Sequence, residues 1–319
     1  NIMKNIYSNI FSYNKKSLNK TIAILKEGNI VGLPTETVYG LAGNAYFKES
    51  IRKIYKLKKR PKINPLIVHF YDYKNAENDV ILNTNFFKLY KKFCPGPITF
   101  ILKKRKKSKI HKITSAHLDT VAIRFPSHKI IRSILKKTIF PLAMPSANIS
   151  SSVSPVNAED VADEFQGKLK FILNGGKSKI GIESTVIDLT KKPIILRPGI
   201  IGADIINKTL KTKISYLKSS AKITSPGMLK KHYSPGIPII LNKIPTNGIA
   251  CITLGKKYKN KKNYFNLSKK SSLKEAASNL YKTLRKIKKL NYKKIYVVKI
   301  PNIDAGIAIN DRLKRAAKK

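Results

Sequence analysis

Residues 211–238 interrupt the periodic pattern of this chain and thereby divide it in two. On either side, short apolar runs alternate with segments whose apolar residues recur at helical spacing. The interval itself is rich in Ser, Lys, Pro and Gly and has no period, which is typical of a linker. Because 319 residues suit two domains of roughly 100–200 residues each, we predict domains over 1–210 and 239–319, joined by a linker over 211–238.

The region before the linker predicts a mixed α/β domain. Strand-like runs occupy 30–33, 65–70, 98–102, 121–125, 171–173, 184–189 and 194–197, and helical patterns occupy 47–57, 85–93 and 157–165. A further helix is expected to be capped by Ser17 and stopped by Gly28. Hairpin-like returns favour a twisted, mixed, open sheet over a purely parallel one.

The region after the linker predicts a second, smaller Rossmann-like α/β domain. Its order is β-β-α-β-α: strands at 239–241 and 249–254, a helix after a Ser272/Glu275 capping box, a strand at 294–300 and a helix at 308–317. G-x-G-x-x-G is absent, so no dinucleotide is implied.

The chain carries a formal charge of +48, from 65 Lys and Arg against 17 Asp and Glu. Such an excess suggests a nucleic-acid-binding protein. Only nine of these cations are arginine, however, the residue better suited to bidentate contacts with phosphates and bases. We therefore favour compositional drift toward Lys, Asn and Ile, as an AT-rich genome would produce, while the cationic surface still allows weak, salt-sensitive RNA binding.

Several features favour a soluble, cytoplasmic protein. No segment approaches the roughly 18 consecutive apolar residues of a membrane span. Cys94 and Cys251 fit no metal-ligand spacing, which suits a reducing compartment. We interpret the first sixteen, basic residues as a frayed terminus rather than the remnant of a transit segment.

Two motifs near the first strands are candidates for anion binding. P-T-E-T-V-Y-G at residues 34–40 is expected to turn from a strand toward a helix, which would present hydroxyls and N–H groups at the sheet edge. Lys58 and Arg60 end a predicted helix, and P-K-I-N-P-L-I-V-H at 61–69 leads directly into a buried strand. Alone, these would be an ordinary turn and a solvated helix end. Together they place two cations at the mouth of the sheet, where they suit a polyphosphate.

Arg124 is expected inside an apolar strand, V-A-I-R-F-P at 121–126. A buried arginine is costly unless it is paired. It therefore either pairs with a structural carboxylate or binds an anionic ligand, and the scarcity of acids leads us to favour the ligand. Other polar residues lie where predicted elements begin or end: P-S-A-N at 145–148, Ser154, Ser184 and Arg197.

Common catalytic signatures are missing from the sequence. H-E-x-x-H and G-x-S-x-G do not occur, and no metal site is predicted. G-G-K-S at 175–178 resembles the end of a P-loop, but the first glycine of that motif would fall at Phe171. ATP would therefore have to bind without a Walker A loop.

Taken in this order, the motifs resemble those of the YrdC-type threonylcarbamoyl-AMP synthases, whose K-x-R…S-x-N signature is matched by Lys58, Arg60, Ser146 and Asn148. Residues from about 17 to 205 resemble the catalytic domain. S-P-G-M-L-K-K-H-Y-S-P at 225–235 resembles the linker of the longer, two-domain members, and N-D-R-L-K-R-A-A at 310–317 resembles their C-terminal helix.

The resemblance implies a nucleotidyltransferase that condenses L-threonine, bicarbonate and ATP to threonylcarbamoyl-AMP and pyrophosphate. Another complex then transfers the threonylcarbamoyl group to adenosine 37 of ANN-decoding tRNAs. This chemistry needs anions held together and neutralised, not an acid–base triad, because the carbamate is already an oxygen nucleophile. Mg²⁺ is expected with ATP, held by phosphates and water.

By motif position, the resemblance also implies the binding residues. Those for threonine and the carbamate are Thr35, His69, Arg124 and Ser184, with Arg124 on the carboxylate. Those for ATP are Lys58, Arg60, Asn64, Ser146, Asn148, Ser154, Arg197, His232 and Tyr233, of which Lys58 and Arg60 are expected to be catalytic. The last two would form part of a lid that excludes water from a labile mixed anhydride. Packing of the two domains against each other explains that pair almost as well.

Two rival functions stay open at this point. One is a non-catalytic basic RNA-binding protein. The other is a carbamoyl-phosphate-dependent carbamoyltransferase, because related domains occur in hydrogenase-maturation proteins. Those proteins carry zinc-finger-like segments, for which two separated cysteines leave no room.

Overall fold

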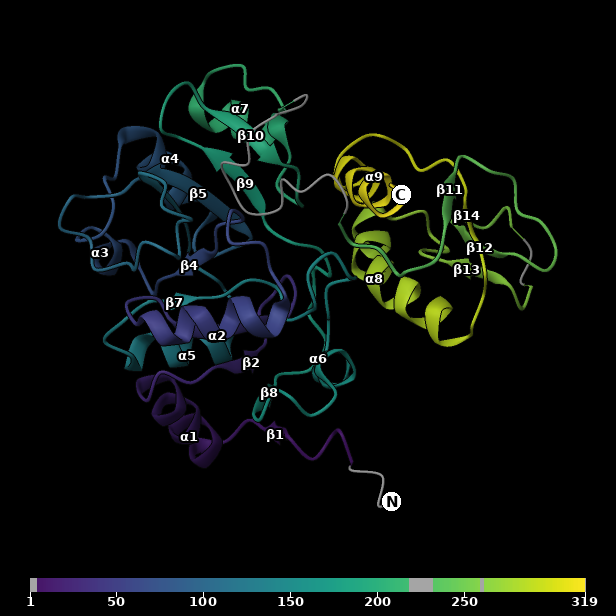
Figure 1. Ribbon diagram of the computed structural model, residues 1–319. Helices are drawn as coiled ribbons and strands as arrows, with labels where there is room; N and C mark the ends of the chain where they lie inside the picture. The colour runs from purple at the N-terminus through teal and green to yellow at the C-terminus, as the bar shows by residue number, and fades with distance from the viewer. Residues whose placement is uncertain (1–4, 218–231, 259–260, 319) are drawn as a thin grey trace.

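A computed structural model describes residues 5–217, 232–258 and 261–318 of the chain. These residues form two α/β domains, each with its own sheet, that lie side by side (Figure 1). The fold class is the predicted one. Residues 218–231, which hold half of the predicted linker and the S-P-G-M-L-K-K part of its motif, lie outside the described residues. No helix in the described part is long and apolar enough to cross a membrane.

The larger sheet is mixed. Among the described residues its strands follow the spatial order β1 (Ile10–Ser12), β8 (Ile172–Asn174), β2 (Val31–Leu33), β3 (Gly40–Asn44), β7 (Leu142–Ala143), β4 (Ile67–His69), β6 (Thr120–Arg124), β5 (Ile98–Lys103), β9 (Thr185–Asp188) and β10 (Ile194–Arg197). The β1–β8, β2–β8, β4–β6 and β5–β9 pairs are parallel, and the other neighbours are antiparallel. The mixed sheet agrees with the hairpin-like returns of the sequence.

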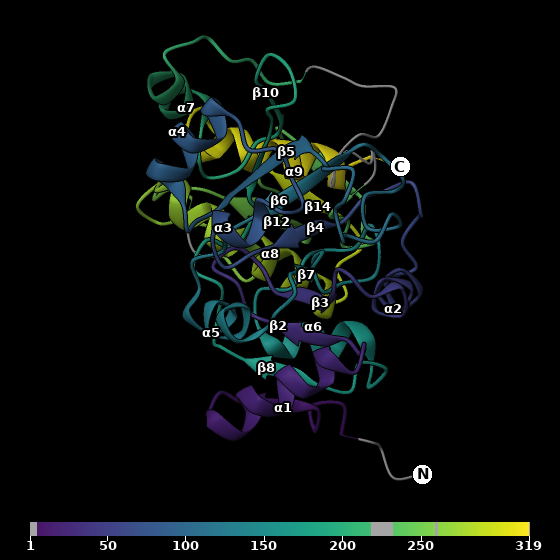
Figure 2. The same ribbon diagram turned by 90° about the vertical axis from the view of Figure 1, so that its left-hand side faces the viewer.

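Helices cover this sheet with their apolar stripes. The described helices of the first domain are α1 (Lys15–Lys26), α2 (Lys48–Lys58), α3 (Tyr73–Ala76), α4 (Thr84–Phe93), α5 (Lys129–Lys137), α6 (Ala158–Phe165) and α7 (Ala203–Leu210). α2, α4, α6 and α7 contribute to the largest core cluster, and α1 and α5 contribute to a separate one. α1 lies at one end of the domain and α7 at the other (Figure 2).

Two local predictions are wrong for identifiable reasons. Ser17 does not cap α1; Asn14 does, and Ser17 sits inside the first turn as the reciprocal partner of a capping box. Residues 34–39 do not turn toward a helix. They lead into β3, which pairs antiparallel with β2. The strand β3 (G-L-A-G-N) was not predicted because it contains two glycines, and glycine is rare inside strands.

The second domain contains β11 (Ile239–Leu241), β12 (Ala250–Thr253), β13 (Tyr264–Asn266), β14 (Ile295–Val297), α8 (Leu273–Lys289) and α9 (Ala305–Ala316). The strands are parallel, in the order β11-β14-β12-β13. This is the predicted open α/β domain with one additional short strand, β13.

α8 and α9 lie on the side of the second sheet that faces the first domain (Figure 1). Their apolar residues share a core cluster with Val38, Val153, Val156 and Ile182 of the first domain. The two backbones approach closely at Gly181, where a Cβ would lie 2.6 Å from the Cα of Ser278. The two domains therefore meet in a continuous apolar interface.

Candidate active site

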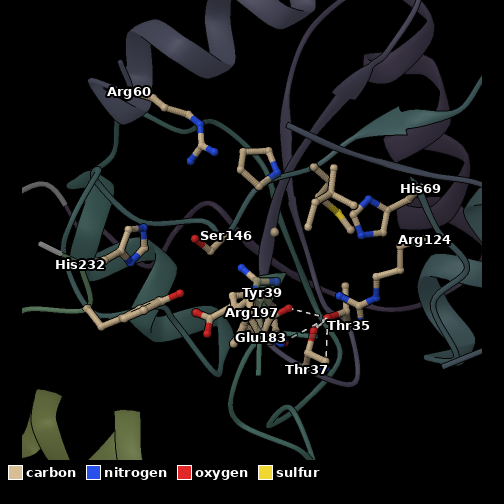
Figure 3. Close-up of a pocket in the computed structure, with 16 residues that line it drawn as sticks. Thr35, Thr37, Tyr39, Arg60, His69, Arg124, Ser146, Glu183, Arg197 and His232 are labelled. Carbon is tan, nitrogen blue, oxygen red and sulfur yellow. Dashed lines mark hydrogen bonds between the residues drawn. The ribbon is translucent and has the colours of Figure 1, made fainter. Parts of the chain in front are cut away.

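A pocket lies where several strands of the larger sheet end, next to the domain interface (Figure 3). It encloses about 50 Å³, whereas sites that hold drug-sized ligands enclose about 300–1,000 Å³. Its lining comprises Thr35, Thr37, Val38, Tyr39, Gly40, Arg60, Ile67, His69, Arg124, Met144, Pro145, Ser146, Glu183, Arg197, His232 and Tyr233. We call it the catalytic pocket.

The lining is strongly cationic. Arg60, Arg124 and Arg197 reach it from three different elements, and they are three of the nine arginines in the chain. All three are buried. Because a buried guanidinium needs a partner, such a concentration indicates an anionic ligand.

Arg60 is held in place by the backbone that follows it. Its Nε donates to the Asn64 carbonyl at 2.9 Å, and its Nη2 donates to Asn64 Oδ1 and to the Pro65 carbonyl, each at 2.7 Å. Burial lowers the pKa of Arg60 to about 10, which still leaves it charged at neutral pH. Asn64 does not line the pocket. It positions Arg60, and its own Nδ2 has no partner among the described residues.

Lys58, the last residue of α2, was expected beside Arg60 at the edge of the sheet, but it is buried behind the pocket. It is 1% exposed and outside the pocket lining. Its Nζ donates to the carbonyls of Ser146 at 2.6 Å and Asn148 at 2.5 Å. The helix ends because Lys59 adopts the left-handed conformation (φ +50°), not because of Pro61. Burial, and then the charge of Arg60, lower the pKa of Lys58 well below its usual value.

The P-S-A-N loop is thus fastened to α2 by Lys58. Ser146 lines the pocket, whereas Asn148 is buried behind it and donates to the carbonyls of Ile149 and Ser152. Asn148 Oδ1 has no partner within the described structure. Of the S-x-N pair, Ser146 therefore lines the pocket, and Asn148 stabilises the loop behind it.

Arg124 and His69 lie opposite each other at the ends of the parallel strands β6 and β4. Of the two partners considered for Arg124, the structure shows the carboxylate, because its Nη2 donates to Glu36 Oε1 at 2.7 Å. Its Nε, however, has no partner among the described residues. Burial and the charge of Arg124 lower the pKa of His69 well below its usual value, so its imidazole is neutral.

Of the residues expected on the threonine side, Thr35 lines the pocket and Ser184 does not. Ser184 lies outside the lining, where its carbonyl and hydroxyl oxygens accept from Arg197 at 3.1 and 3.2 Å. Thr35 lines the pocket, and its hydroxyl donates to the Val38 carbonyl at 2.6 Å. Ser184 thus orients an arginine that reaches the pocket.

Glu183 connects the catalytic pocket to the second domain, and the sequence did not predict this. Its carboxylate accepts from Arg312 of α9 at 2.9 Å, from Tyr281 of α8 at 2.8 Å and from Ser154 at 2.5 Å. Burial opposes its ionisation, but Arg312 and Arg197 outweigh burial and lower the pKa of Glu183 to about 2. Ser154 acts through this carboxylate and does not line the pocket.

His232 closes the pocket from the side of the second domain (Figure 3), and Tyr233, the next residue, also lines it. Tyr233 is fully buried, and its ring lies under the Arg312 guanidinium (5.1 Å) and stacks on Tyr281. Burial lowers the pKa of His232 to about 3. His232 Nδ1 and the Tyr233 hydroxyl have no partners in the described structure. The pair therefore packs the two domains and lines the pocket at once.

Comparison with known proteins finds related sequences for both domains. Residues 23–199 match the family described as "Telomere recombination", and residues 200–318 match "Threonylcarbamoyl-AMP synthase, C-terminal domain". The threonylcarbamoyl-AMP synthase of Pyrococcus abyssi is 34% identical over 92% of each chain, and that of Bacillus subtilis is 32% identical over 96% of this chain and 94% of its own. The chain belongs to the threonylcarbamoyl-AMP synthase family. It is therefore an enzyme.

A solved member of the family has the same fold. The structure of Pyrococcus abyssi Sua5 complexed with L-threonine superposes with a TM-score of 0.88 and 31% identity, covering 97% of this chain and 96% of the other. Both domains of this threonylcarbamoyl-AMP synthase family member, and not only the catalytic one, are thus shared with that protein.

The described residues offer no group of three or more His, Cys, Asp or Glu side chains placed to hold a metal ion. The carboxylate in the catalytic pocket, Glu183, is already bound by three donors. These residues do not fit a resident metal, so any magnesium would belong to the nucleotide substrate.

Proposed function

We propose that this protein is an L-threonylcarbamoyladenylate synthase and hence a nucleotidyltransferase. Its substrates would be L-threonine, bicarbonate and ATP, with Mg²⁺ entering as the ATP complex. The observation that carries the proposal is the convergence of Arg60, Arg124 and Arg197 on one buried pocket, in a chain of this family. Such a pocket suits the joining of two anions.

The proposed reaction proceeds in two balanced steps. Bicarbonate and the threonine amine form a carbamate with loss of water. A carbamate oxygen then attacks the α-phosphorus of ATP, so that a P–O bond forms to the carbamate while the bond to the β-phosphate oxygen breaks and pyrophosphate leaves. Neutral His69 and the buried arginines hold and neutralise these anions.

The residues divide between the two substrates by position. Arg124, with Nε unpaired, would bind the threonine carboxylate beside Thr35 and His69, while Ser184 orients the neighbouring Arg197. Arg60, Arg197 and Ser146 would bind the triphosphate, with Lys58, Asn64, Asn148 and Ser154 holding that half of the site in shape.

Admission of ATP requires the pocket to enlarge, because it now encloses only about 50 Å³. His232 and Tyr233 occupy its outer side, so we propose that they move away for ATP and return over the adenylate. Their return would exclude water from the mixed anhydride.

The biological role that we propose follows from the product. Threonylcarbamoyl-AMP would pass, in the cytoplasm, to the complex that modifies adenosine 37 of ANN-decoding tRNAs. Incubation of the full-length protein with ATP, magnesium, ¹³C-bicarbonate and ¹⁵N-threonine, followed by mass spectrometry, should give an adenylate carrying both labels. An adenylate that lacks the bicarbonate carbon would contradict the proposal.

A further inference from the structure

An arginine of the second domain binds two carboxylates of the first. Arg285, on α8, donates through Nη2 to Glu164 Oε2 at 3.1 Å, and its Nε lies 4.0 Å from Asp160 Oδ2, one turn earlier on α6. The Arg285 and Glu164 side chains are each 12% exposed. Arg285 Nη2 also donates to the Val153 carbonyl. Because the chain has only nine arginines and 17 acids, lysine drift does not account for this group.

The other oxygen of Glu164 binds the turn that follows P-S-A-N. We call residues 148–152 the 148–152 turn. Glu164 Oε1 accepts from the Ile149 backbone N–H at 2.9 Å and from the Ser152 hydroxyl. One carboxylate of α6 therefore joins this turn to the guanidinium of Arg285 in the second domain.

The 148–152 turn continues the loop that carries Ser146 to the catalytic pocket. It begins with the last residue of P-S-A-N, Asn148, whose Nδ2 donates to the carbonyls of Ile149 and Ser152 at 2.7 and 3.0 Å. The turn is thus closed on itself by hydrogen bonds. A shift of the backbone at Ile149 would therefore move the end of the loop that holds Ser146.

Glu164 has room to leave the turn if its counter-ion is removed. It lines a cavity of about 770 Å³ between α1, α2 and α6. The same cavity is lined by six lysines, which are Lys20, Lys53, Lys56, Lys59, Lys168 and Lys170. A carboxylate freed from Arg285 would turn toward water and these cations, because an ion gains more from them than from two neutral donors. Arg285 thus keeps the carboxylate on the turn.

We propose that Arg285 is a positioning residue for the nucleotide half of the catalytic pocket, and that it acts through Glu164 on the loop that carries Ser146. The proposal rests on the proposed function, in which Ser146 binds the triphosphate. Arg285 itself does not line the catalytic pocket. The second domain would then set the position of an ATP-binding residue of the first domain, in addition to covering the pocket.

Equilibrium binding tests this role without turnover. Full-length protein is titrated by calorimetry with α,β-methylene-ATP and magnesium, and separately with threonine. Arg285→Met should weaken binding of the ATP analogue at least about fivefold and binding of threonine less than about twofold, because Ser146 belongs to the nucleotide half. Unchanged analogue binding, or equal weakening for both ligands, would overturn the proposal. Failure of the unmodified protein to bind either ligand would instead contradict the proposed function.

Lys289→Met is the matched control for the loss of an ion pair between the domains. Lys289 also joins α8 to α6, because its Nζ lies 2.5 Å from Asp163 Oδ2. The other Asp163 carboxylate oxygen accepts from the Tyr7 hydroxyl at 2.7 Å and not from the 148–152 turn. Lys289→Met should therefore change analogue binding less than about twofold. Weakening equal to that of Arg285→Met would show that any ion pair between the domains has this effect.

A double-mutant cycle separates action through Glu164 from simple packing of the domains. If Arg285 acts through Glu164, adding Arg285→Met to Glu164→Leu should weaken analogue binding less than about twofold further. Effects that multiply in the double variant would assign Arg285 to domain packing and contradict the proposal.

Two conservative variants complete the test. Arg285→Lys keeps the charge beside Glu164 and should bind the analogue within about threefold of the unmodified protein; binding as weak as that of Arg285→Met would contradict the role. If Arg285→Met does not fold, Glu164→Gln replaces it, since the amide loses the ion pair but keeps an oxygen for the turn. Unchanged analogue binding by Glu164→Gln would overturn the proposal.

Discussion

At the residue scale, Lys58 holds the loop that carries Ser146, because its ammonium donates to two backbone carbonyls of that loop. The residue should therefore affect both stability and turnover. Lys58→Met should lower the free energy of unfolding by about 1–3 kcal/mol for each acceptor left unsatisfied and also reduce turnover. Arg60→Ala should reduce turnover roughly 10²–10³-fold by removing a cation from the reacting phosphates. Urea denaturation and adenylate formation measure the two effects. Lys48→Met, at an exposed position of the same helix, is the control, and an unaltered urea midpoint for Lys58→Met would refute the structural role.

Arg124 and Glu36 form one buried pair, so a single substitution cannot report on ligand binding alone. We compare Arg124→Ala/Glu36→Gln with Glu36→Gln. The double variant should raise the KM for threonine at least about tenfold more than the KM for ATP, because a carboxylate loses its guanidinium. If the KM for ATP rises instead, Arg124 belongs to the nucleotide half of the site.

His232 should make stability depend on pH. Burial lowers its pKa to about 3 in the folded protein, below the usual 6.5 of the unfolded chain, so the unfolded state binds more protons between these values. The contribution of His232 is complete above about pH 6.5 and is lost as pH falls toward 3, by at most about 1.4 kcal/mol per pH unit. His232→Gln should flatten the fall in urea midpoint over this range. If the urea midpoints of His232→Gln and of the unmodified protein depend on pH in the same way, the folded state tolerates the charged His232 imidazole.

The sequence predicted the cations of the site better than its carboxylates. Arg60, Arg124 and Arg197 followed from motif position, whereas the partnership of Glu183 with Arg312 could not be predicted, because it joins residues 129 positions apart in different domains. A usable signal existed nonetheless. In a chain with 17 acids, Glu36 lies inside P-T-E-T-V-Y-G and Glu183 directly precedes Ser184, and scarce acids at such positions indicate buried pairing.

At the scale of elements, α9 supports the catalytic pocket through Glu183 without lining it. Arg312 is 1% exposed and gives Glu183 its principal counter-charge. Arg312→Met should therefore cost about 3–5 kcal/mol, the usual effect of leaving a buried charge unpaired. The loss should be smaller in Arg312→Met/Glu183→Gln, which leaves no uncompensated charge. Thermal or urea unfolding measures both, with exposed Lys314→Met as control, and an additive double variant would contradict the pairing.

Most elements with a strong apolar period were predicted within a few residues, but α5 (Lys129–Lys137), whose apolar stripe is strong, and α7 (Ala203–Leu210) were not predicted. α8 follows its stripe and capping residues closely, whereas the glycine-containing β3 and the three-residue β13 gave too little pattern to detect. Helix α2 was found, but its end was misplaced, because the left-handed Lys59 carries no compositional signal.

At the scale of the whole molecule, the net charge of +48 and the catalytic pocket make opposite predictions about salt. RNA binding driven by surface lysines should weaken steeply as salt rises from 50 to 200 mM, because each phosphate contact releases counterions. The proposed adenylate synthesis would depend on buried cations, which salt screens far less, and should change by less than about threefold. Filter binding and pyrophosphate release, measured in the same buffers, compare the two. Activity that falls in parallel with RNA binding would favour the RNA-binding alternative.

The pairing of Glu183 with Arg312 also sets an order of events on the ribosome. The two residues are 129 positions apart, so the carboxylate emerges from the exit tunnel long before its guanidinium. Since domains generally fold as units during synthesis, N-terminal first, the nascent first domain must pass through an interval in which Glu183 has Ser154 but neither Arg312 nor Tyr281. Until α9 has been translated, this carboxylate therefore has no guanidinium of the second domain to pair with.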